Sequence, residues 1–364
     1  MHGWCPIRAG VKTALAAPHN AVALDWRPAN LTLPPGETDN RSVSSPTTMI
    51  ELRSGDATCT VLPGLGAMVS SLRLETPTGK TLETIWMPQN FTPLSGQWPG
   101  GGIPILFPFA GRSWHDGDVG QWQFHGRVRP MPIHGFAWSL PWKTISRTSD
   151  TVTLHLQSSR TSWEFYPCDF ELQITWSLSP RMLKADLAIT HDEDGVGAAM
   201  GETVPATHLP TAPGFHPYFR MPLTQPGSTR RDWEHCEVTS NATRATLVTP
   251  AGNAGESRPY DGVSPHRLDD SYVHNLILGD LAAPTATLTD RMATLAIEMK
   301  TTGDSPLRYR TLWGKPAEGF FCMEPWCGLP DAAKRPASEG GALLVRRGET
   351  IRMGFSVGLG PSRS

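Results

Sequence analysis

The sequence lacks any apolar run approaching the ~20 residues that a helix needs to cross a bilayer. It is also poor in charge, because Asp, Glu, Lys and Arg make up only 18% of its 364 residues and the formal net charge is −2. Such a balance offers no electrostatic attraction for nucleic acid or for an anionic membrane surface. The composition therefore favours a small, neutral or weakly charged ligand, and we expect no nucleic-acid or membrane partner.

Motifs for several kinds of chemistry are also missing. The chain has no Gly-x-x-x-x-Gly-Lys-Ser/Thr phosphate loop and no Gly-x-Gly-x-x-Gly dinucleotide fingerprint. Its six cysteines are scattered, and the spacing of Cys322 and Cys327 matches no zinc or redox motif. Most of these cysteines are interpreted as small buried hydrophobic residues. We therefore expect no metal and no cofactor.

The first 48 residues differ from the rest. They are rich in Pro, Ser and Thr and show no sustained periodicity. Their apolar stretch is short and interrupted by Pro18, so it makes a poor signal peptide, and the sequence predicts a cytoplasmic protein. We expect residues 1–48 to be a poorly ordered or loosely attached extension and residues 49–364 to form a single domain, with Met49 as an alternative start.

Period-2 alternation of apolar and polar residues recurs from there on, and it is typical of strands with one buried face. With 35 Gly and 34 Pro spread along the chain, many short elements joined by turns are expected rather than long helices. The pattern predicts an all-β protein, a large and mainly antiparallel β-sandwich. The clearest alternating runs are 151–157, 171–178, 183–190, 295–299 and 351–359, with a hairpin turn at 179–182.

Four segments place chemistry-bearing side chains among apolar or aromatic residues: GGGIPILFPFAGR (100–112), MPIHGFA (131–137), PGFHPYF (213–219) and CMEPWCG (322–328). The carboxylate in the last segment lies in a largely apolar stretch, where desolvation would raise its pKa towards that of a base working near neutrality. The alternatives are a structural ion pair for that carboxylate, a structural role for each histidine, and a surface position for the arginine. Together a carboxylate, two imidazoles and a guanidinium suit proton transfer on a neutral, polyhydroxylated ligand.

Five segments carry a resemblance to a known family: GGIPILFPFAGR, IHGFAW, GFHPYF, LDDSY (268–272) and MEPWCGLPDA. In this order and at these separations they resemble the successive signatures of the aldose 1-epimerase (galactose mutarotase-like) superfamily, from about Met49 to the C-terminus. The resemblance implies a β-supersandwich with an open cleft across one sheet. It also implies an isomerase that interconverts the α and β anomers of an aldose by acid–base ring opening, without a metal.

The resemblance also implies roles for individual residues. Glu324 corresponds to the family's catalytic base and His216 to its general acid. Arg112 and His134 correspond to residues that bind the sugar. Asp269 corresponds to an aspartate that binds a sugar hydroxyl, with the adjacent Asp270 as the alternative.

The chain departs from the family pattern at Trp138, where many members carry arginine, and at Arg220, where well-studied galactose mutarotases carry asparagine. The preferred monosaccharide therefore stays open. A hexose 6-phosphate 1-epimerase is one alternative, since that branch shares the fold and the base. A non-catalytic carbohydrate-binding module is another. A lyase or hydrolase is disfavoured, because no second carboxylate lies in a comparable context. We expect a monomer or a homodimer.

Overall fold

The computed structural model describes residues 49–92, 97–193, 207–224 and 233–362. These residues form mostly strands, arranged in antiparallel sheets, and the α-helix α1 (Arg160–Phe165) is only six residues long. The predicted all-β, antiparallel class is confirmed. The predicted division after residue 48 stays a prediction, because residues 1–48 lie outside the described ranges.

Two large sheets dominate. The nine-stranded sheet has the order β10 (Lys143–Arg147), β11 (Thr151–Gln157), β12 (Phe170–Ser179), β13 (Met182–His191), β27 (Thr350–Pro361), β23 (Leu295–Thr301), β22 (Thr285–Asp290), β17 (Cys236–Thr239) and β20 (His266–Arg267). The eight-stranded sheet has the order β19 (Ala254–Pro259), β18 (Ala242–Val248), β21 (Leu276–Leu281), β24 (Tyr309–Lys315), β25 (Phe320–Trp326), β15 (Gly214–Phe215) and β5 (Ile105–Leu106), with β16 (Tyr218–Arg220) also paired to β25.

Smaller sheets and turns complete the described part. A four-stranded sheet contains β1 (Ile50–Ser54), β2 (Ala57–Leu62), β3 (Met68–Glu75) and β4 (Thr81–Glu83). Three two-stranded sheets pair β6 (Trp114–His115) with β7 (Asp118–Val119), β8 (Gln121–Phe124) with β9 (Arg127–Pro130), and β14 (His208–Thr211) with β26 (Leu343–Arg346). Short 3-10 turns lie at η1 (Ala137–Ser139), η4 (Ser271–Val273), η5 (Ala332–Lys334) and η6 (Ala337–Glu339).

The alternating sequence pattern becomes the alternating burial of the strands. In β12 every second side chain, beginning with Phe170, is buried, because successive side chains of a strand point to opposite faces. Ser179 and Met182 pair across the predicted two-residue turn between β12 and β13. The turn at 179–182 and all five alternating runs are thus found as the sequence predicts.

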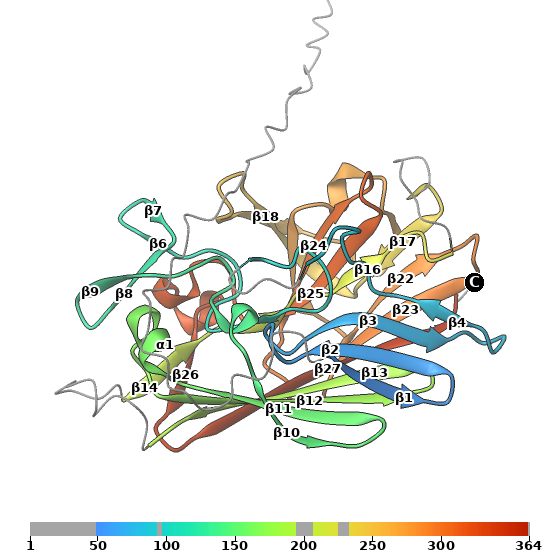
Figure 1. Cartoon of the computed structure of the whole chain (residues 1–364). Coiled ribbons are helices and arrows are strands. Elements are labelled where there is room, and N and C mark those ends of the chain that lie inside the picture. The colour runs from blue at the N-terminus through green and yellow to red at the C-terminus, as the bar shows by residue number, and fades with distance from the viewer. Residues whose placement is uncertain (1–48, 93–96, 194–206, 225–232, 363–364) are drawn as a thin grey trace, which may run out of the picture. The chain divides into compact units, whose positions relative to one another are not determined.

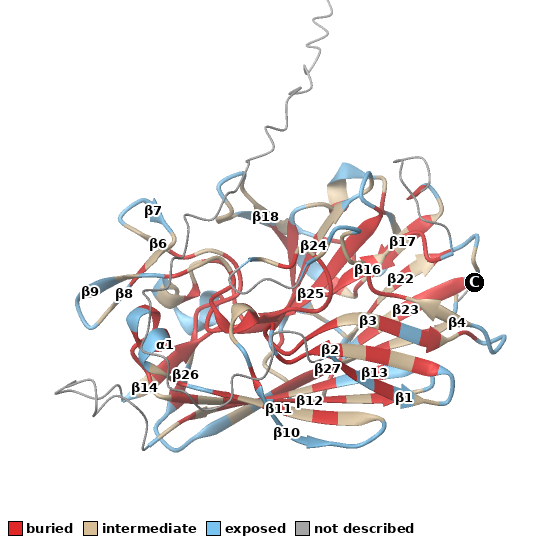
Figure 2. Cartoon of the chain, viewed as in Figure 1, coloured by how far each residue is buried: buried red, intermediate tan, exposed pale blue. Residues whose placement is uncertain are grey.

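The main core lies between the two large sheets. Phe215 of β15 contacts Phe355 of β27, with ring centroids 4.7 Å apart, and Trp176 of β12, at 6.2 Å. Figure 1 shows β24 and β25 in one layer and β11, β12 and β27 in another. Figure 2 shows that β25 is buried along its whole length. Both faces of β25 are therefore covered, one of them by this core.

No helix among the described residues is long and apolar enough to span a membrane.

Candidate active site

Strand β25 presents its alternate side chains to two different environments. Phe321 and Met323 belong to the main core between the large sheets. Cys322 and Trp326 instead belong to two separate apolar clusters on the opposite face of the sheet. Glu324 lies between them in the period-2 pattern, so its carboxylate is on this second face. The site is therefore built on the face of the eight-stranded sheet that points away from the main core.

His216 reaches the same face from the short segment between β15 and β16. Gly214 pairs with Trp326 and Tyr218 pairs with Cys322, so His216 lies level with Glu324. Its backbone N–H donates to the carbonyl of Pro104, and its ring stacks on that of Tyr218 with centroids 4.5 Å apart. The imidazole is thus held in place by backbone pairing on both sides and by an aromatic neighbour.

His216 and Glu324 form a close, buried pair. Nε2 of His216 lies 3.3 Å from Oε2 of Glu324, and the exposed fractions of the two residues are 5% and 1%. Burial raises the pKa of the Glu324 carboxyl well above its ordinary value, an effect partly offset by the neighbouring Trp326 indole. Burial and the nearby His134 lower the pKa of His216 well below its ordinary value. Both shifts favour the uncharged forms, with the proton of the pair on Glu324.

Several polar atoms around this pair are buried without a hydrogen-bond partner among the described residues. They are Nδ1 of His216, Nε1 of Trp326 and Oγ1 of Thr311, together with Oε2 of Glu324, which lies 3.3 Å from Nε2 of His216 but accepts no well-aligned hydrogen bond. Buried polar groups in proteins are nearly always hydrogen-bonded, because an unpaired group loses its interaction with water. Unpaired atoms from four neighbouring side chains are expected where a ligand with several hydroxyl groups is to be bound.

His134 lies beside this pair and belongs to the MPIHGFA segment (131–137). Its ring centroid lies 5.2 Å from that of His216, and its Nδ1 accepts a hydrogen bond from the Gly111 N–H. Nδ1 is therefore unprotonated, and Nε2 carries the hydrogen that can be donated to a ligand. Burial, and secondly the charge of Arg112, lowers the pKa of His134 to about 3. His134 is thus a neutral hydrogen-bond donor near neutral pH.

The glycine after His134 has a structural reason. Gly135 adopts φ +73°, and a Cβ at this position would lie 1.9 Å from the carbonyl oxygen of Phe107. The two backbones can approach this closely only because residue 135 has no side chain. This contact joins the GGGIPILFPFAGR and MPIHGFA segments and sets the position of His134.

The low pKa of His134 predicts a loss of stability in acid. In the unfolded chain this histidine binds a proton below pH 6.5, whereas in the folded protein it does so only at about pH 3. Its contribution is full above pH 6.5 and is lost as the pH falls towards 3, about 2 kcal/mol of it between pH 7 and pH 5. We expect His134→Asn, which tolerates the positive φ at this position, to lose correspondingly less unfolding free energy between these pH values.

Denaturant unfolding at pH 7 and pH 5 measures this difference. His125→Asn is the matched control, since His125 is exposed and also has a positive φ. Equal pH dependence in the wild type and His134→Asn would contradict the buried neutral state of this imidazole.

Arg112 lies at the edge of this group and is half-buried. Its side chain packs over Gly252, where a Cβ would lie 2.8 Å from Cδ of the arginine. No carboxylate among the described residues forms an ion pair with it, and burial lowers the pKa of its guanidinium. Arg112 is therefore a cation beside His134 that remains available to a ligand.

The structure does not bring Asp269 into contact with the other four predicted residues. Its carboxylate is bonded to Nε and Nη2 of Arg267, at the β20 end of the nine-stranded sheet. Asp270 caps η4 and accepts from the backbone N–H of Tyr272. The sugar-binding role of Asp269, like the choice between the two aspartates, stays a prediction.

Sequence reasoning missed the aromatic residues that cover the pair. The ring of Trp98 stacks on His134 at 5.0 Å and meets His216 edge-on at 5.5 Å, and its Nε1 donates to the hydroxyl of Tyr218. Trp138 packs edge-on against Trp98 at 5.1 Å. The chain has 13 tryptophans. The only feature of the local sequence that could have marked Trp98 as a site residue was its position just before the glycine run.

Within the described ranges there are two groups of side chains, and each group brings together three residues that could bind a metal ion. In the site itself, ligand atoms of His216, Cys322 and Glu324 lie within 4.8 Å of one another. The second group is His235, Cys236 and Asp290.

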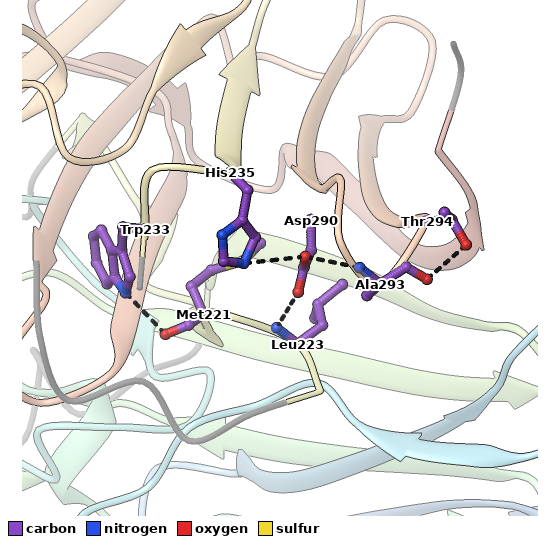
Figure 3. A network of polar contacts seen from close by, with 7 residues as sticks. All are labelled: Met221, Leu223, Trp233, His235, Asp290, Ala293 and Thr294. Atoms are coloured by element: carbon purple, nitrogen blue, oxygen red, sulfur yellow. Dashed lines mark hydrogen bonds and ion pairs between the residues drawn. The ribbon is translucent and has the colours of Figure 1, made fainter. Parts of the chain in front are cut away.

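The second group is better explained as structural. The Asp290 carboxylate accepts from the backbone N–H groups of Leu223 and Ala293, each at 3.0 Å, and lies 3.6 Å from Nε2 of His235 (Figure 3). Its oxygens are thus already engaged in holding the segment after β16 against the β22–β23 turn.

Two other features carry no catalytic geometry. The run Gly354-Phe-Ser-Val-Gly358 has the Gly-x-Ser-x-Gly spacing of a serine nucleophile turn, but it lies inside strand β27 and not between a strand and a helix. The described surface cavities lie by Trp122 and by Pro306, and none of the five predicted residues lines them.

Comparison with protein families decides the relationship. The family model described as aldose 1-epimerase matches residues 48–357 of this chain. The chain belongs to the aldose 1-epimerase family. The resemblance drawn from the five sequence segments is confirmed, and the chain is placed among enzymes that epimerise carbohydrates.

Solved structures share the fold of this chain. A galactose mutarotase-like protein from Lactobacillus casei is 23% identical, with a TM-score of 0.67, and the match covers 86% of this chain and 100% of that one. A galactose 1-epimerase from Lactobacillus acidophilus is 16% identical, with a TM-score of 0.61, over 89% and 98% of the two chains. These likenesses confirm the galactose mutarotase-like sandwich.

One curated relative concerns a phosphorylated sugar. A Salmonella typhimurium protein that bears the name of a glucose-6-phosphate 1-epimerase is 31% identical over 94 residues. The match spans 25% of this aldose 1-epimerase family member and 28% of that relative, less than a third of its length.

Proposed function

We propose that this protein is an aldose 1-epimerase that interconverts the α and β anomers of a neutral aldose, with Glu324 as general base and His216 as general acid. The observation that supports this most directly is the buried pair itself, with Nε2 and Oε2 3.3 Å apart and unpaired polar atoms around it. Family membership supports the reaction class, and the departures at positions 138 and 220 leave the sugar open.

The proposed reaction moves two protons in opposite directions. Glu324 takes the proton of the anomeric hydroxyl while His216 donates one to the ring oxygen, and the bond between C1 and that oxygen breaks. The open-chain aldehyde turns about the C1–C2 bond and presents its other face. On closure the carboxylic acid returns its proton to the carbonyl oxygen, and the imidazole takes the proton of the attacking hydroxyl. The pair ends as it began.

The opposed pKa shifts set the starting point of this cycle. Because burial disfavours both charges, the free pair keeps its proton on Glu324, and this proton has to pass to His216 across the 3.3 Å contact before the sugar ring opens. A proton can then pass from one end of the hemiacetal to the other without exchange with solvent. Each positioned proton-transfer group typically contributes about 10²–10⁴-fold to a rate. In this proposal the Nε2–H of His134 and the guanidinium of Arg112 orient hydroxyl groups and stabilise developing charge.

A hexose 6-phosphate is the second candidate substrate. The partial match to the Salmonella typhimurium relative favours it, as does Arg112, a half-buried cation with no carboxylate ion-paired to it among the described residues. A guanidinium suits a phosphate group because it donates two parallel hydrogen bonds. A single such cation is a weak phosphate site, so the neutral aldose is preferred.

Saturation-transfer NMR of anomer exchange tests the proposal. With D-galactose, D-glucose and D-glucose 6-phosphate as probes, we expect the protein to accelerate exchange of a neutral aldose well beyond the buffer rate. Excess EDTA in a parallel set should leave the rate unchanged, since the proposed proton transfers need no metal.

If the protein accelerated anomer exchange of glucose 6-phosphate alone, the result would favour a hexose 6-phosphate as the substrate. No acceleration of any probe, combined with measurable sugar binding, would contradict an enzymatic role and favour a binding module. A rate that disappears with EDTA would show that a metal held by a set such as His216, Cys322 and Glu324 takes part.

A further inference from the structure

Thr311 lies directly beside the proposed catalytic base. It pairs with Glu324 in the register of β24 and β25, so the two side chains share one face of the sheet with their Cβ atoms roughly 5 Å apart. Thr311 is buried, with an exposed fraction of 6%, and its Oγ1 has no hydrogen-bond partner in the part of the chain that the structure describes. A buried hydroxyl that bonds to nothing costs stability in the free protein. We therefore expect this hydroxyl, next to Glu324, to form a hydrogen bond with a bound ligand.

The neighbours of Thr311 in the same cross-sheet row cannot satisfy its hydroxyl. On the side away from Glu324 the next residue is Ile277 of β21, which is apolar and buried. Beyond it lies Thr246 of β18, whose hydroxyl is already bonded to that of Ser257 at 2.8 Å. Thr311 is thus the unpaired hydroxyl of this row, and it points to the same space as the acid–base pair.

The order of groups along the row matches the order of atoms in a pyranose. His216 lies level with Glu324 on the β15–β16 side, and Thr311 lies on the β24 side. In a pyranose ring the anomeric carbon stands between the ring oxygen and C2. If His216 serves the ring oxygen and Glu324 the anomeric hydroxyl, the group that falls over Thr311 is the hydroxyl on C2.

We propose that Thr311 binds the C2 hydroxyl of the sugar and is a specificity-determining residue of the site. This inference rests on the proposed function, because it takes the roles of His216 and Glu324 from it. Binding this hydroxyl would hold C2 while C1 turns about the bond between them, and so keep the open-chain aldehyde in position to close again. The site would then discriminate between an aldose and its 2-deoxy analogue.

Thr311→Val tests the assignment, because it replaces the hydroxyl by a methyl group of similar size. With D-glucose or D-galactose, whichever is exchanged faster, we expect kcat/KM to fall by roughly 3- to 10-fold, the effect of one lost hydrogen bond between neutral groups. With the 2-deoxy analogue of the same sugar, the variant and the wild type should agree within about twofold. With the 6-deoxy analogue the loss should reappear in full.

Thr246→Val is the matched control, since it makes the same change in the same row at a hydroxyl that already has a partner. Its kcat/KM should stay near that of the wild type with every sugar. Thermal unfolding of Thr311→Val should show a midpoint equal to or above that of the wild type, because the replaced hydroxyl was unpaired.

Two outcomes would overturn the assignment while leaving the proposed function intact. One is that the wild type is active and the kcat/KM of Thr311→Val falls by the same factor with the parent sugar and with its 2-deoxy analogue. The other is a Thr311→Val variant that matches the wild type with all sugars. A wild type that accelerates exchange of no sugar would instead overturn the proposed function itself.

Discussion

Glu324→Gln should slow enzymatic anomer exchange by about 10²–10⁴-fold, the contribution typical of a positioned general base. The amide keeps the volume of the carboxyl group but cannot take a proton from the anomeric hydroxyl. Because the Glu324 carboxyl group is buried, the substitution removes a group that is costly to bury. The thermal midpoint should therefore stay the same or rise while activity falls, a combination that a structural carboxylate would not produce.

The measurement is saturation-transfer NMR with the best aldose, accompanied by a sugar-binding measurement and a thermal melt. Glu318→Gln is the matched control, since Glu318 lies exposed in the turn of the same β24–β25 hairpin and pairs only with Lys315 in the described contacts. Near-normal activity of Glu324→Gln would refute the base assignment. A large fall in its thermal midpoint would favour a structural role.

His216→Gln should lower the rate by a similar factor of about 10²–10⁴, since the amide cannot donate a proton to the ring oxygen and regain it on closure. The two groups act in the same ring-opening step, so their effects should not multiply. The variant carrying both substitutions should be no more than about threefold slower than the slower single variant, as is found when residues act as one catalytic unit.

His155→Gln provides the control for this series, because His155 lies on β11 of the nine-stranded sheet, where its ring is 3.8 Å from Glu171. It should retain wild-type activity. If the double variant instead shows the product of the two single losses, the residues work independently, and the coupled transfer of two protons is not the basis of the reaction.

The strands could be predicted locally because side chains alternate between two faces of a strand and one face is buried. This is why the run at 151–157 and the turn at 179–182 coincide with the structure. The same local logic identified Glu324 as unusual, since a carboxyl group in an apolar segment must be either paired or functional. It could not tell these two possibilities apart, because a partner is recognised only in three dimensions.

Site residues whose local sequence is ordinary could not be predicted from the sequence. Thr311 stands in a strand between an arginine and a leucine, and nothing in that context distinguishes it from any other strand threonine. Trp98 is one of 13 tryptophans, and its position over both histidines follows from the packing of its segment. The carboxylate of Asp269 accepts a hydrogen bond from Arg267, and the LDDSY motif gave no indication of this contact.

By itself the sequence determined that this chain forms an antiparallel β-sandwich of the aldose 1-epimerase family, with a carboxyl group and two imidazoles in apolar surroundings. The tertiary structure alone decided that His216 meets Glu324 and that Thr311 stands on its other side. The physical reason is that periodicity sets which face a side chain occupies, whereas the order and register of strands set its neighbours on that face. Strand order depends on the packing of the whole chain, and no local stretch of sequence records it.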